Sequence, residues 1–372
     1  MKVLFPFVGD SVGGSHRSTI ELYKALKSHE IDAVILLHYD NGPLSKLLKI
    51  EKIPYKVLSV KTLAGGIPKK KSIIIGILKN IFSFSKFLIS HKVNIVHGND
   101  LRVNLTWSLP TLLTGKKFVW HQRTILSKSK LWKFIPFMCN FFIGISKLIV
   151  NGSPSNIRKR NKKLVYNPFN VDKFFNKKKS RALIKKRFGI SNRIFLIGYI
   201  GRVVSSKNID FIIESLPKLK NLGNRKVHFL IVGRGETEYI NQLKKKISNL
   251  KIKKEITFSG FVSNPEEIIS GIDLLVSASV IDGFGRSLVE AMIQKTPVLA
   301  AAGGGHTEII QDKNTGFLYN PDDYIDFKKK LNDIIFKNYN IRKIVSKAQK
   351  NAIINYSIDT HVTKIIKIYK NL

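Results

Sequence analysis

The sequence alternates short apolar runs with amphipathic segments, and this alternation restricts the fold more than any other feature. Strands are predicted at 2–8, 32–37, 94–97, 117–120 and 142–145, and again at 194–200, 227–232, 256–258, 274–277 and 298–301. Helices are predicted at 18–28 and 72–90, and at 209–219, 240–249, 265–271 and 287–294. Strands that alternate with helices predict parallel sheets covered by helices. We therefore expect an α/β fold with a doubly wound sheet in each half.

Length and a change in composition predict two domains. A chain of 372 residues is longer than one hydrophobic core usually supports. Between 158 and 187 the sequence has thirteen Lys or Arg residues and one acid, Asp172. We expect a Rossmann-like domain at 1–172, a linker at 173–190, a second Rossmann-like domain at 191–355, and a C-terminal helix at about 356–372 packed on the first domain. Ligands of such sheets bind beyond the carboxyl ends of the strands, which predicts a ligand between the two domains.

The net charge is +39, and the basic residues are unevenly distributed. From 52 to 171 the sequence has twenty-two Lys or Arg residues and only one acid, Asp100. This stretch favours an anionic membrane surface as a partner; the alternative is a composition rich in Lys, Ile and Asn that reflects an A/T-rich genome. The helix at 72–90 has Phe84 on its apolar stripe and Lys79 and Lys86 opposite. That stripe is interpreted as a core face or as a membrane anchor.

Cysteine usage and the lengths of the apolar runs indicate the compartment. Cys139 is the single cysteine and has no partner for a disulfide, which favours a reducing compartment. The apolar amino-terminal segment is too short for a signal peptide, and the longest apolar runs fall short of the roughly 18 residues that span a membrane. We expect a cytoplasmic protein, peripheral on the inner face of the cell membrane.

The densest set of candidate site residues lies in the second half. Gly201 ends a predicted strand and lets the backbone approach a ligand, while Arg202 and Lys207 bring two cations to one diphosphate. A leaving diphosphate needs this neutralisation because negative charge grows on it as the sugar departs. Asp282 and Glu290 flank a glycine turn and the start of a helix, where free N–H groups bind anions. Glu290 is a candidate acceptor for two ribose hydroxyls, with a solvated helix face as the alternative.

In this order the residues resemble the family 4 retaining glycosyltransferases of the GT-B fold. The resemblance rests on Gly13-Gly14-Ser15, His97, His121, Ser146, 167–172, Gly201-Arg202 with Lys207, 232–235, 258–261, 282–290, 303–305 with Glu308, and 315–318. It implies a nucleotide sugar held mostly by the second domain and an acceptor held mostly by the first. It also implies no obligatory metal and no cofactor, because Arg202 and Lys207 take the place of a divalent cation. The family usually has a glutamate where Asp282 stands, and the shorter side chain is expected to alter the choice of donor sugar.

The resemblance also implies a reaction and roles for its residues. The implied reaction transfers a hexose or N-acetylhexosamine from a nucleotide diphosphate sugar to a lipid-linked or lipopolysaccharide glycan of a bacterium, for instance O-antigen or capsule. In this reaction the leaving phosphate oxygen takes the acceptor proton. The implied catalytic residues are His121, Arg202, Lys207 and Asp282. The implied donor-binding residues are Gly13, Gly14, Gly201, Arg202, Lys207, Gly233, Phe261, Asp282, Gly283, Phe284, Gly285, Arg286, Ser287 and Glu290. The acceptor candidates are His16, Arg17, Asn99 and Arg123; a structural role for His121 and a tight turn at Gly13-Gly14 are the alternatives.

Other classes of protein share single features of this sequence. A nicotinamide dehydrogenase needs Gly-x-Gly-x-x-Gly after a strand, and 233–238 lacks the third glycine. Nucleic-acid binding would use the charge, but no recognition motif is present, so no nucleic-acid partner is expected. A nucleotide-sugar 2-epimerase on the same fold and a transferase to a soluble acceptor remain as alternatives. The sequence does not predict the oligomeric state.

Overall fold

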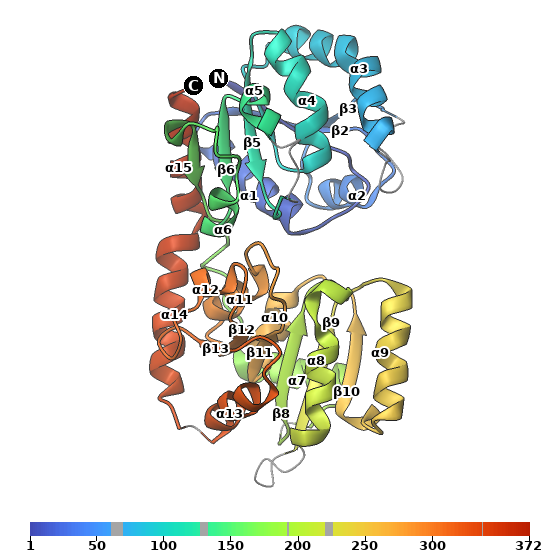
Figure 1. Ribbon diagram of the computed structural model, residues 1–372, viewed down its shortest axis with the longest axis vertical. Coiled ribbons are helices and arrows are strands. Elements are labelled where there is room, and N and C mark those ends of the chain that lie inside the picture. Colours follow the sequence, from blue (N-terminus) through green and yellow to red (C-terminus); the bar gives the residue numbers. More distant parts are fainter. Residues whose placement is uncertain (61–69, 127–132, 192, 220–225, 337) are drawn as a thin grey trace. The chain divides into compact units, whose positions relative to one another are not determined.

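The computed structural model describes residues 1–60, 70–126, 133–191, 193–219, 226–336 and 338–372. The chain forms two compact units, residues 1–169 with 356–372 and residues 170–355. Each unit is built around its own parallel sheet, so the predicted α/β class with a doubly wound sheet in each half is confirmed (Figure 1). Among the described residues, none of the helices combines the length and the apolar character that crossing a membrane requires.

The sheet of the first unit has the strand order β3-β2-β1-β4-β5-β6-β7. Its strands are β1 (Lys2–Phe7), β2 (Asp32–Leu37), β3 (Tyr55–Val57), β4 (Ile95–Gly98), β5 (Lys117–Gln122), β6 (Phe141–Gly144) and β7 (Lys162–Leu164). Its helices are α1 (Gly14–Ser28), α2 (Pro43–Ile50), α3 (Lys70–Ser90), α4 (Leu101–Leu113), α5 (Ile135–Met138), α6 (Lys147–Asn151) and α15 (Ile358–Lys370). The order reverses between β1 and β4, and open sheets of this kind bind ligands at the carboxyl ends of the strands beside such a reversal.

Alternate residues of β1 enter two different cores, because successive side chains of a strand point to opposite faces of the sheet. Val3, Phe5 and Phe7 pack with α1, α2 and α15, and Leu4 packs with α3 and α4 on the other face. Helix α15 lies beside α1, so the C-terminal segment completes the core of the first unit.

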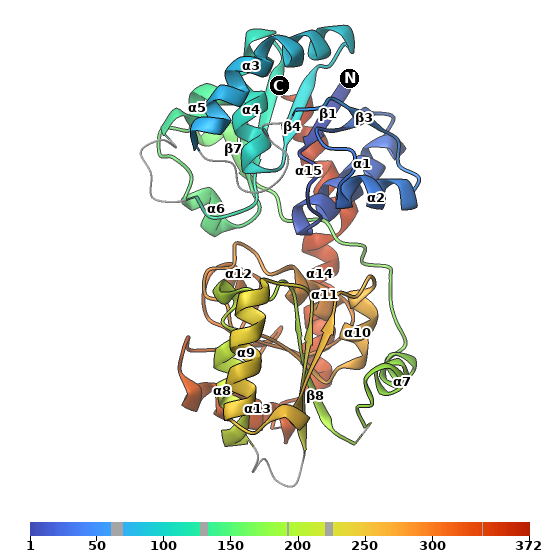
Figure 2. The same ribbon diagram turned by 90° about the vertical axis from the view of Figure 1, so that its right-hand side faces the viewer.

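The sheet of the second unit has the order β10-β9-β8-β11-β12-β13. Its strands are β8 (Phe195–Ile200), β9 (Val227–Val232), β10 (Ile256–Gly260), β11 (Leu274–Ser277), β12 (Val298–Ala301) and β13 (Phe317–Tyr319). Its helices are α7 (Lys177–Phe188), α8 (Ile209–Ser215), α9 (Thr237–Asn249), α10 (Pro265–Gly271), α11 (Arg286–Ile293), α12 (His306–Ile309), α13 (Tyr324–Ile335) and α14 (Ile341–Tyr356). Helices α8 and α9 cover one face and α7 and α10 the other (Figure 2).

The structure adds elements that the sequence did not predict. The strands β3, β7 and β13 have three residues each, which is too short for a clear apolar pattern. The segment expected to be a linker, 173–190, contains α7, which packs on α10 within the second unit. Its lysines suggested an exposed connection, but Ser180 and Ile184, one turn apart, are buried on the side of α7 that packs on α10.

Helix α3 has one buried face and one exposed apolar face. Phe84 is buried and stacks on Trp107 of α4 with ring centroids 4.3 Å apart, so this part of the predicted stripe is a core face. The opposite side carries Lys79 and Lys86, as predicted, but also Ile75, Leu78, Phe82 and Ile89, whose exposed fractions are 48%, 64%, 78% and 63%.

Candidate functional site

The predicted site residues of the second unit follow the carboxyl ends of β8, β9, β10 and β11, because all strands of this sheet are parallel. Gly201 follows β8 and Gly233 follows β9. A Cβ atom at Gly233 would lie 1.8 Å from the carbonyl oxygen of Gly201, so the two backbones touch where only glycine fits. Two strand ends are thereby held together with their backbones open to a ligand.

Lys207 and Asp282 form an ion pair. Lys207 lies in the short 3-10 turn at 205–207 and Asp282 in the loop after β11, and the Lys207 Nζ is 2.6 Å from the Asp282 Oδ2. His306 at the start of α12 places its Nε2 3.9 Å from the same oxygen. Burial raises the pKa of Asp282, but the neighbouring His306 and the charge of Lys207 outweigh this effect and hold the pKa well below its usual range. The carboxylate is therefore ionised throughout the physiological pH range.

Two glycine-rich loops pack backbone to backbone around this ion pair. The amide of Gly305 donates to the carbonyl of Asp282 at 2.7 Å, and a Cβ atom at Gly305 would lie 2.6 Å from the Cα of Phe284. Gly285 has a φ of +100° immediately before α11, a conformation that favours glycine. The triple glycine at 303–305 thus supports the loop that leads into α11.

Helix α11 begins at Arg286, one residue before the predicted start. The Nη2 of Arg286 lies 3.4 Å from the Oε1 of Glu290 one turn later, so two residues predicted to bind the donor are neighbours on this helix. Both side chains are largely buried, and the structure does not place Glu290 on a solvated helix face. The amide groups of the first turn of α11 give this end of the helix a positive field.

Arg202 lies in the loop after β8 and Phe261 in the loop after β10, and both side chains are exposed. The hydroxyl of buried Tyr199 donates to the carbonyl of Arg202 at 2.6 Å, which fixes the backbone while the guanidinium stays exposed. Phe261 is 54% exposed, and the guanidinium of Arg234 lies 5.1 Å from its ring centre. A planar exposed ring beside a cation suits stacking with a flat ligand.

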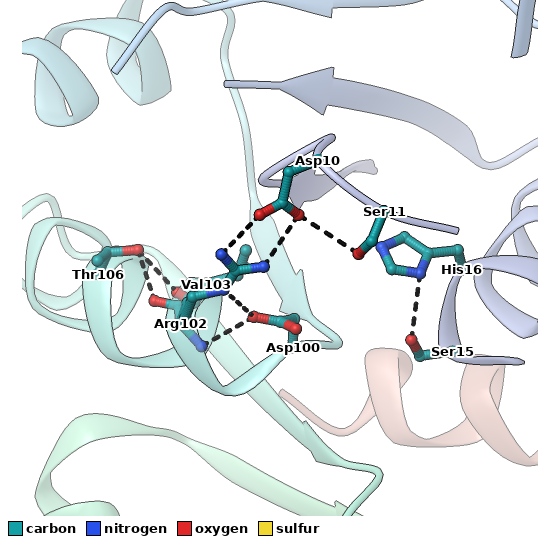
Figure 3. Close-up of polar contacts among 8 residues, drawn as sticks. All are labelled: Asp10, Ser11, Ser15, His16, Asp100, Arg102, Val103 and Thr106. Carbon is teal, nitrogen blue, oxygen red and sulfur yellow. Dashed lines mark hydrogen bonds and ion pairs between the residues drawn. The ribbon is translucent and has the colours of Figure 1, made fainter. Parts of the chain in front are cut away.

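In the first unit, Arg102 of α4 fastens the loop after β1 (Figure 3). Its Nη1 and Nη2 lie 2.8 Å and 3.0 Å from the two carboxylate oxygens of Asp10. Asp100 caps α4 by accepting from the backbone N–H of Arg102 at 2.9 Å. No sequence motif marks Asp10, Asp100 and Arg102 as a group, although Asp100 is the single acid between 52 and 171.

His16 closes the glycine turn at the start of α1. Its Nδ1 lies 3.4 Å from the Ser15 hydroxyl (Figure 3). The same nitrogen accepts from the amide of Gly13 at 3.1 Å, and the ring stacks on Phe7. Burial lowers the pKa of His16, so the ring is neutral with its proton on Nε2. Gly13 and His16 therefore form one turn, while Gly14 opens α1 and Arg17 in its first turn is half-buried.

His121 is fully buried in a network that also contains two acceptor candidates. Its Nδ1 is 3.0 Å from the Nε2 of His97 and 3.5 Å from the Nη2 of Arg123. The Arg123 guanidinium donates to the Oδ1 of Asn99 at 2.6 Å and to the Oδ1 of Asn167. Burial and the charge of Arg123 lower the pKa of His121 well below its usual value, so the imidazole is neutral.

The comparisons with known proteins agree with the fold. Residues 180–352 match the family model of glycosyl transferases group 1. A poly(ribitol-phosphate) alpha-N-acetylglucosaminyltransferase of Staphylococcus aureus (strain COL) is 28% identical over 177 residues, 47% of this chain, and the chain spans only 35% of that relative. An uncharacterized glycosyltransferase of Methanocaldococcus jannaschii is 24% identical over 388 residues, covering 100% of this chain and 99% of that protein.

Among solved structures, HepE of Anabaena in complex with UDP-glucose has a TM-score of 0.84 at 21% identity, with 100% of both chains covered. The two units with their seven- and six-stranded parallel sheets, together with this likeness, define the GT-B fold, as the sequence predicted. The family match lies within the second unit, and both of the relatives above are glycosyltransferases by name.

Proposed function

We propose that the protein is a retaining glycosyltransferase that takes a hexose or N-acetylhexosamine from a nucleoside diphosphate and needs no metal ion. The observation that carries this proposal is the arrangement at the strand ends of the second unit. Two cations, Arg202 and Lys207, follow β8, and the first turn of α11 follows the neighbouring parallel strand β11. The backbones of Gly201 and Gly233 are in contact at the ends of β8 and β9. Cations and free amide groups at one sheet edge suit a diphosphate that gains negative charge as it leaves.

The donor in this proposal is a UDP-sugar. The likeness to Anabaena HepE, whose structures contain UDP and UDP-glucose, supports that choice. Glu290, largely buried in α11, accepts from the ribose hydroxyls, and Asp282 contacts the sugar while its ion pair with Lys207 keeps it ionised. His121 and the glycine turn at 13–14 act from the first unit, where His16, Arg17, Asn99 and Arg123 are the candidates for binding the acceptor.

The acceptor is a lipid-linked or lipopolysaccharide glycan, and the protein works on an anionic membrane face. The exposed face of α3 supports this part of the proposal. Four apolar side chains, Ile75, Leu78, Phe82 and Ile89, share this helix with exposed Lys79 and Lys86. Apolar side chains flanked by lysines are typical of helices that lie in the interface of an anionic bilayer.

A donor screen tests the proposed function. The purified protein is incubated with UDP-, GDP- and ADP-glucose and with UDP-N-acetylglucosamine, with and without EDTA, and both donor hydrolysis and thermal unfolding are measured. We expect one nucleotide class to raise the melting temperature and to be hydrolysed slowly, because a ligand that binds the folded state stabilises it. Loss of both effects in EDTA would overturn the metal-free mechanism. A change of the sugar in the donor without transfer would favour a 2-epimerase.

A further inference from the structure

A line of buried polar side chains crosses the first unit from α15 to the segment after β7. The Tyr369 hydroxyl is hydrogen-bonded to the Nδ1 of His97, whose Nε2 lies 3.0 Å from the Nδ1 of His121. The ring of His121 is nearly parallel to that of His361, with centroids 6.2 Å apart, and the His361 Nδ1 is 2.6 Å from the carbonyl oxygen of Tyr166. The three histidines and Tyr369 are each at most 3% exposed.

The tyrosine end of this line determines where the protons lie. Burial raises the pKa of Tyr369 well above 10, so its hydroxyl keeps its hydrogen. The Nδ1 of His97 is the one hydrogen-bond partner that this hydroxyl has among the described residues, so the hydrogen is donated to that nitrogen. Burial lowers the pKa of His97, so this ring is neutral and carries a single proton. Because its Nδ1 accepts, the proton of His97 is on Nε2, and it is donated to the Nδ1 of His121.

Arg123 independently gives the same proton order. A guanidinium has only N–H donors, and its Nη2 lies 3.5 Å from the Nδ1 of His121. That nitrogen of His121 therefore accepts from both sides. The one proton of the neutral ring is on Nε2, which is a hydrogen-bond donor.

His361 has the opposite arrangement. Its Nδ1 faces the carbonyl oxygen of Tyr166, which can only accept, so the proton of this neutral ring is on Nδ1 and its Nε2 carries a lone pair. The Nε2 atoms of His121 and His361 are both buried, and neither has a hydrogen-bond partner among the residues that the structure describes. Buried polar atoms are nearly always paired, so both atoms require a partner.

We propose that His121 and His361 bind one hydroxyl oxygen, and that Tyr369, acting through His97, is a positioning residue that fixes the donor of this pair. A hydroxyl group accepts from the N–H of His121 and donates its own hydrogen to the Nε2 of His361. A carboxylate has no hydrogen for His361, and a cation has no lone pair for His121. The oxygen belongs to a water molecule or to a sugar hydroxyl; the second source rests on the proposed function, whereas the proton order does not.

Nuclear magnetic resonance of protein labelled with ¹⁵N at its nine histidines tests the proton order directly. Long-range ¹H–¹⁵N spectra report which ring nitrogen is protonated. We expect His97 and His121 to carry the proton on Nε2 and His361 to carry it on Nδ1, unchanged from pH 8 to pH 6. A proton on the Nδ1 of His121, or on the Nε2 of His361, would overturn the proposal.

The substitution Tyr369→Phe tests the positioning role. Without the phenol hydrogen the Nδ1 of His97 regains a free lone pair, so the titration midpoint of His97 should rise by about one pH unit or more. Tyr23→Phe, at a second buried tyrosine of the same core, is the matched control and should leave that midpoint unchanged. An unchanged midpoint in folded Tyr369→Phe would show that Tyr369 has only a packing role.

Titration with UDP and with UDP-glucose identifies the source of the oxygen. A shift of the His121 Nε2–H signal with UDP-glucose that UDP alone does not produce shows a sugar hydroxyl. Equal spectra with both ligands show a water molecule at the same site. If neither nucleotide raises the melting temperature, UDP is not the donor nucleotide, and the proton order is still measured on the free protein.

Discussion

The Nζ of Lys207 and the Oδ2 of Asp282 are 2.6 Å apart, although 75 residues separate them in the sequence. The pair joins the turn after β8 to the loop after β11. Strands β8 and β11 are neighbours in the sheet, and the strand order reverses between them. A cation held at this point can neutralise the diphosphate of a sugar nucleotide, and an anion beside it can accept hydrogen bonds from the sugar. The pair also keeps Asp282 ionised, since the charge of Lys207 helps to lower the pKa of this carboxylate.

Removing the cation of this pair should abolish most of the activity. In Lys207→Met the carboxylate of Asp282 faces the diphosphate without compensation, and we expect donor turnover to fall about 100-fold or more. Lys246→Met, which removes a lysine paired with Glu214 on the surface, should keep the wild-type rate. Turnover of UDP-sugar measured for the three proteins checks this, and an active Lys207→Met would remove Lys207 from the catalytic residues.

Acid should destabilise the first unit through its buried histidines. Burial lowers the pKa of His38 to about 4, whereas the unfolded chain has the ordinary value of 6.5. Between pH 6.5 and pH 4 this histidine binds a proton in the unfolded state but not in the folded state. The free energy of unfolding therefore falls as the pH falls, by about 1.4 kcal/mol per pH unit for each such histidine. Denaturant unfolding from pH 7.5 to pH 4.5 measures the slope. His38→Phe should reduce it, and His29→Phe, at an exposed histidine, should not.

Arg102 should control the mobility of the loop after β1. Replacement by lysine keeps the charge but loses the two parallel hydrogen bonds to Asp10, so we expect faster amide hydrogen exchange in residues 8–13 and a KM for the donor raised several-fold. Arg158→Lys, at an exposed arginine of the same unit, is the control. Identical exchange rates in wild type and Arg102→Lys would contradict a role for the ion pair in holding this loop.

The exposed face of α3 should bind anionic vesicles. In Leu78→Ser/Phe82→Ser, the fraction of protein that sediments with phosphatidylglycerol vesicles should fall about tenfold, because each large apolar side chain contributes about 1.5–3 kcal/mol when fully buried. Ile325→Ser changes an equally exposed apolar residue of the second unit and should have no effect. Binding to neutral phosphatidylcholine vesicles should be weak for all three proteins, and equal sedimentation of wild type and double variant would exclude this face.

Gly235 should tolerate no side chain. A Cβ atom there would lie 1.7 Å from the carbonyl oxygen of Val203, so Gly235→Ala must displace backbone and should cost about 2 kcal/mol or more of unfolding free energy. At Gly13 a Cβ atom would meet only the His16 Nδ1, at an ordinary contact distance of 3.9 Å, so Gly13→Ala is the matched control. Similar melting temperatures for the two variants would show that the loops after β8 and β9 are free to separate.

Most of the architecture was predictable because it follows from local patterns. The apolar runs identify the inner strands, and the alternation in β1 already assigns Val3 and Leu4 to opposite faces. The short edge strands β3, β7 and β13 were missed because they have only three residues each, and α7 because it is rich in lysine. The helices α2, α4, α13 and α14 were not predicted either. The glycines at 201, 233 and 303–305 were found because close approach of two backbones leaves a signal in the residue type itself.

The sequence by itself therefore determined the two parallel sheets, the order of the candidate donor-binding residues and the basic character of the first half. Only the tertiary structure decided which side chains meet. Arg102 binds Asp10, 92 residues earlier in the chain, because β1 and β4 are neighbours in the sheet. Tyr369 binds His97, 272 residues earlier, because α15 returns to the core of the first unit. Such pairs depend on strand order and on the packing of a distant helix, which bring together residues that no local pattern in the chain connects.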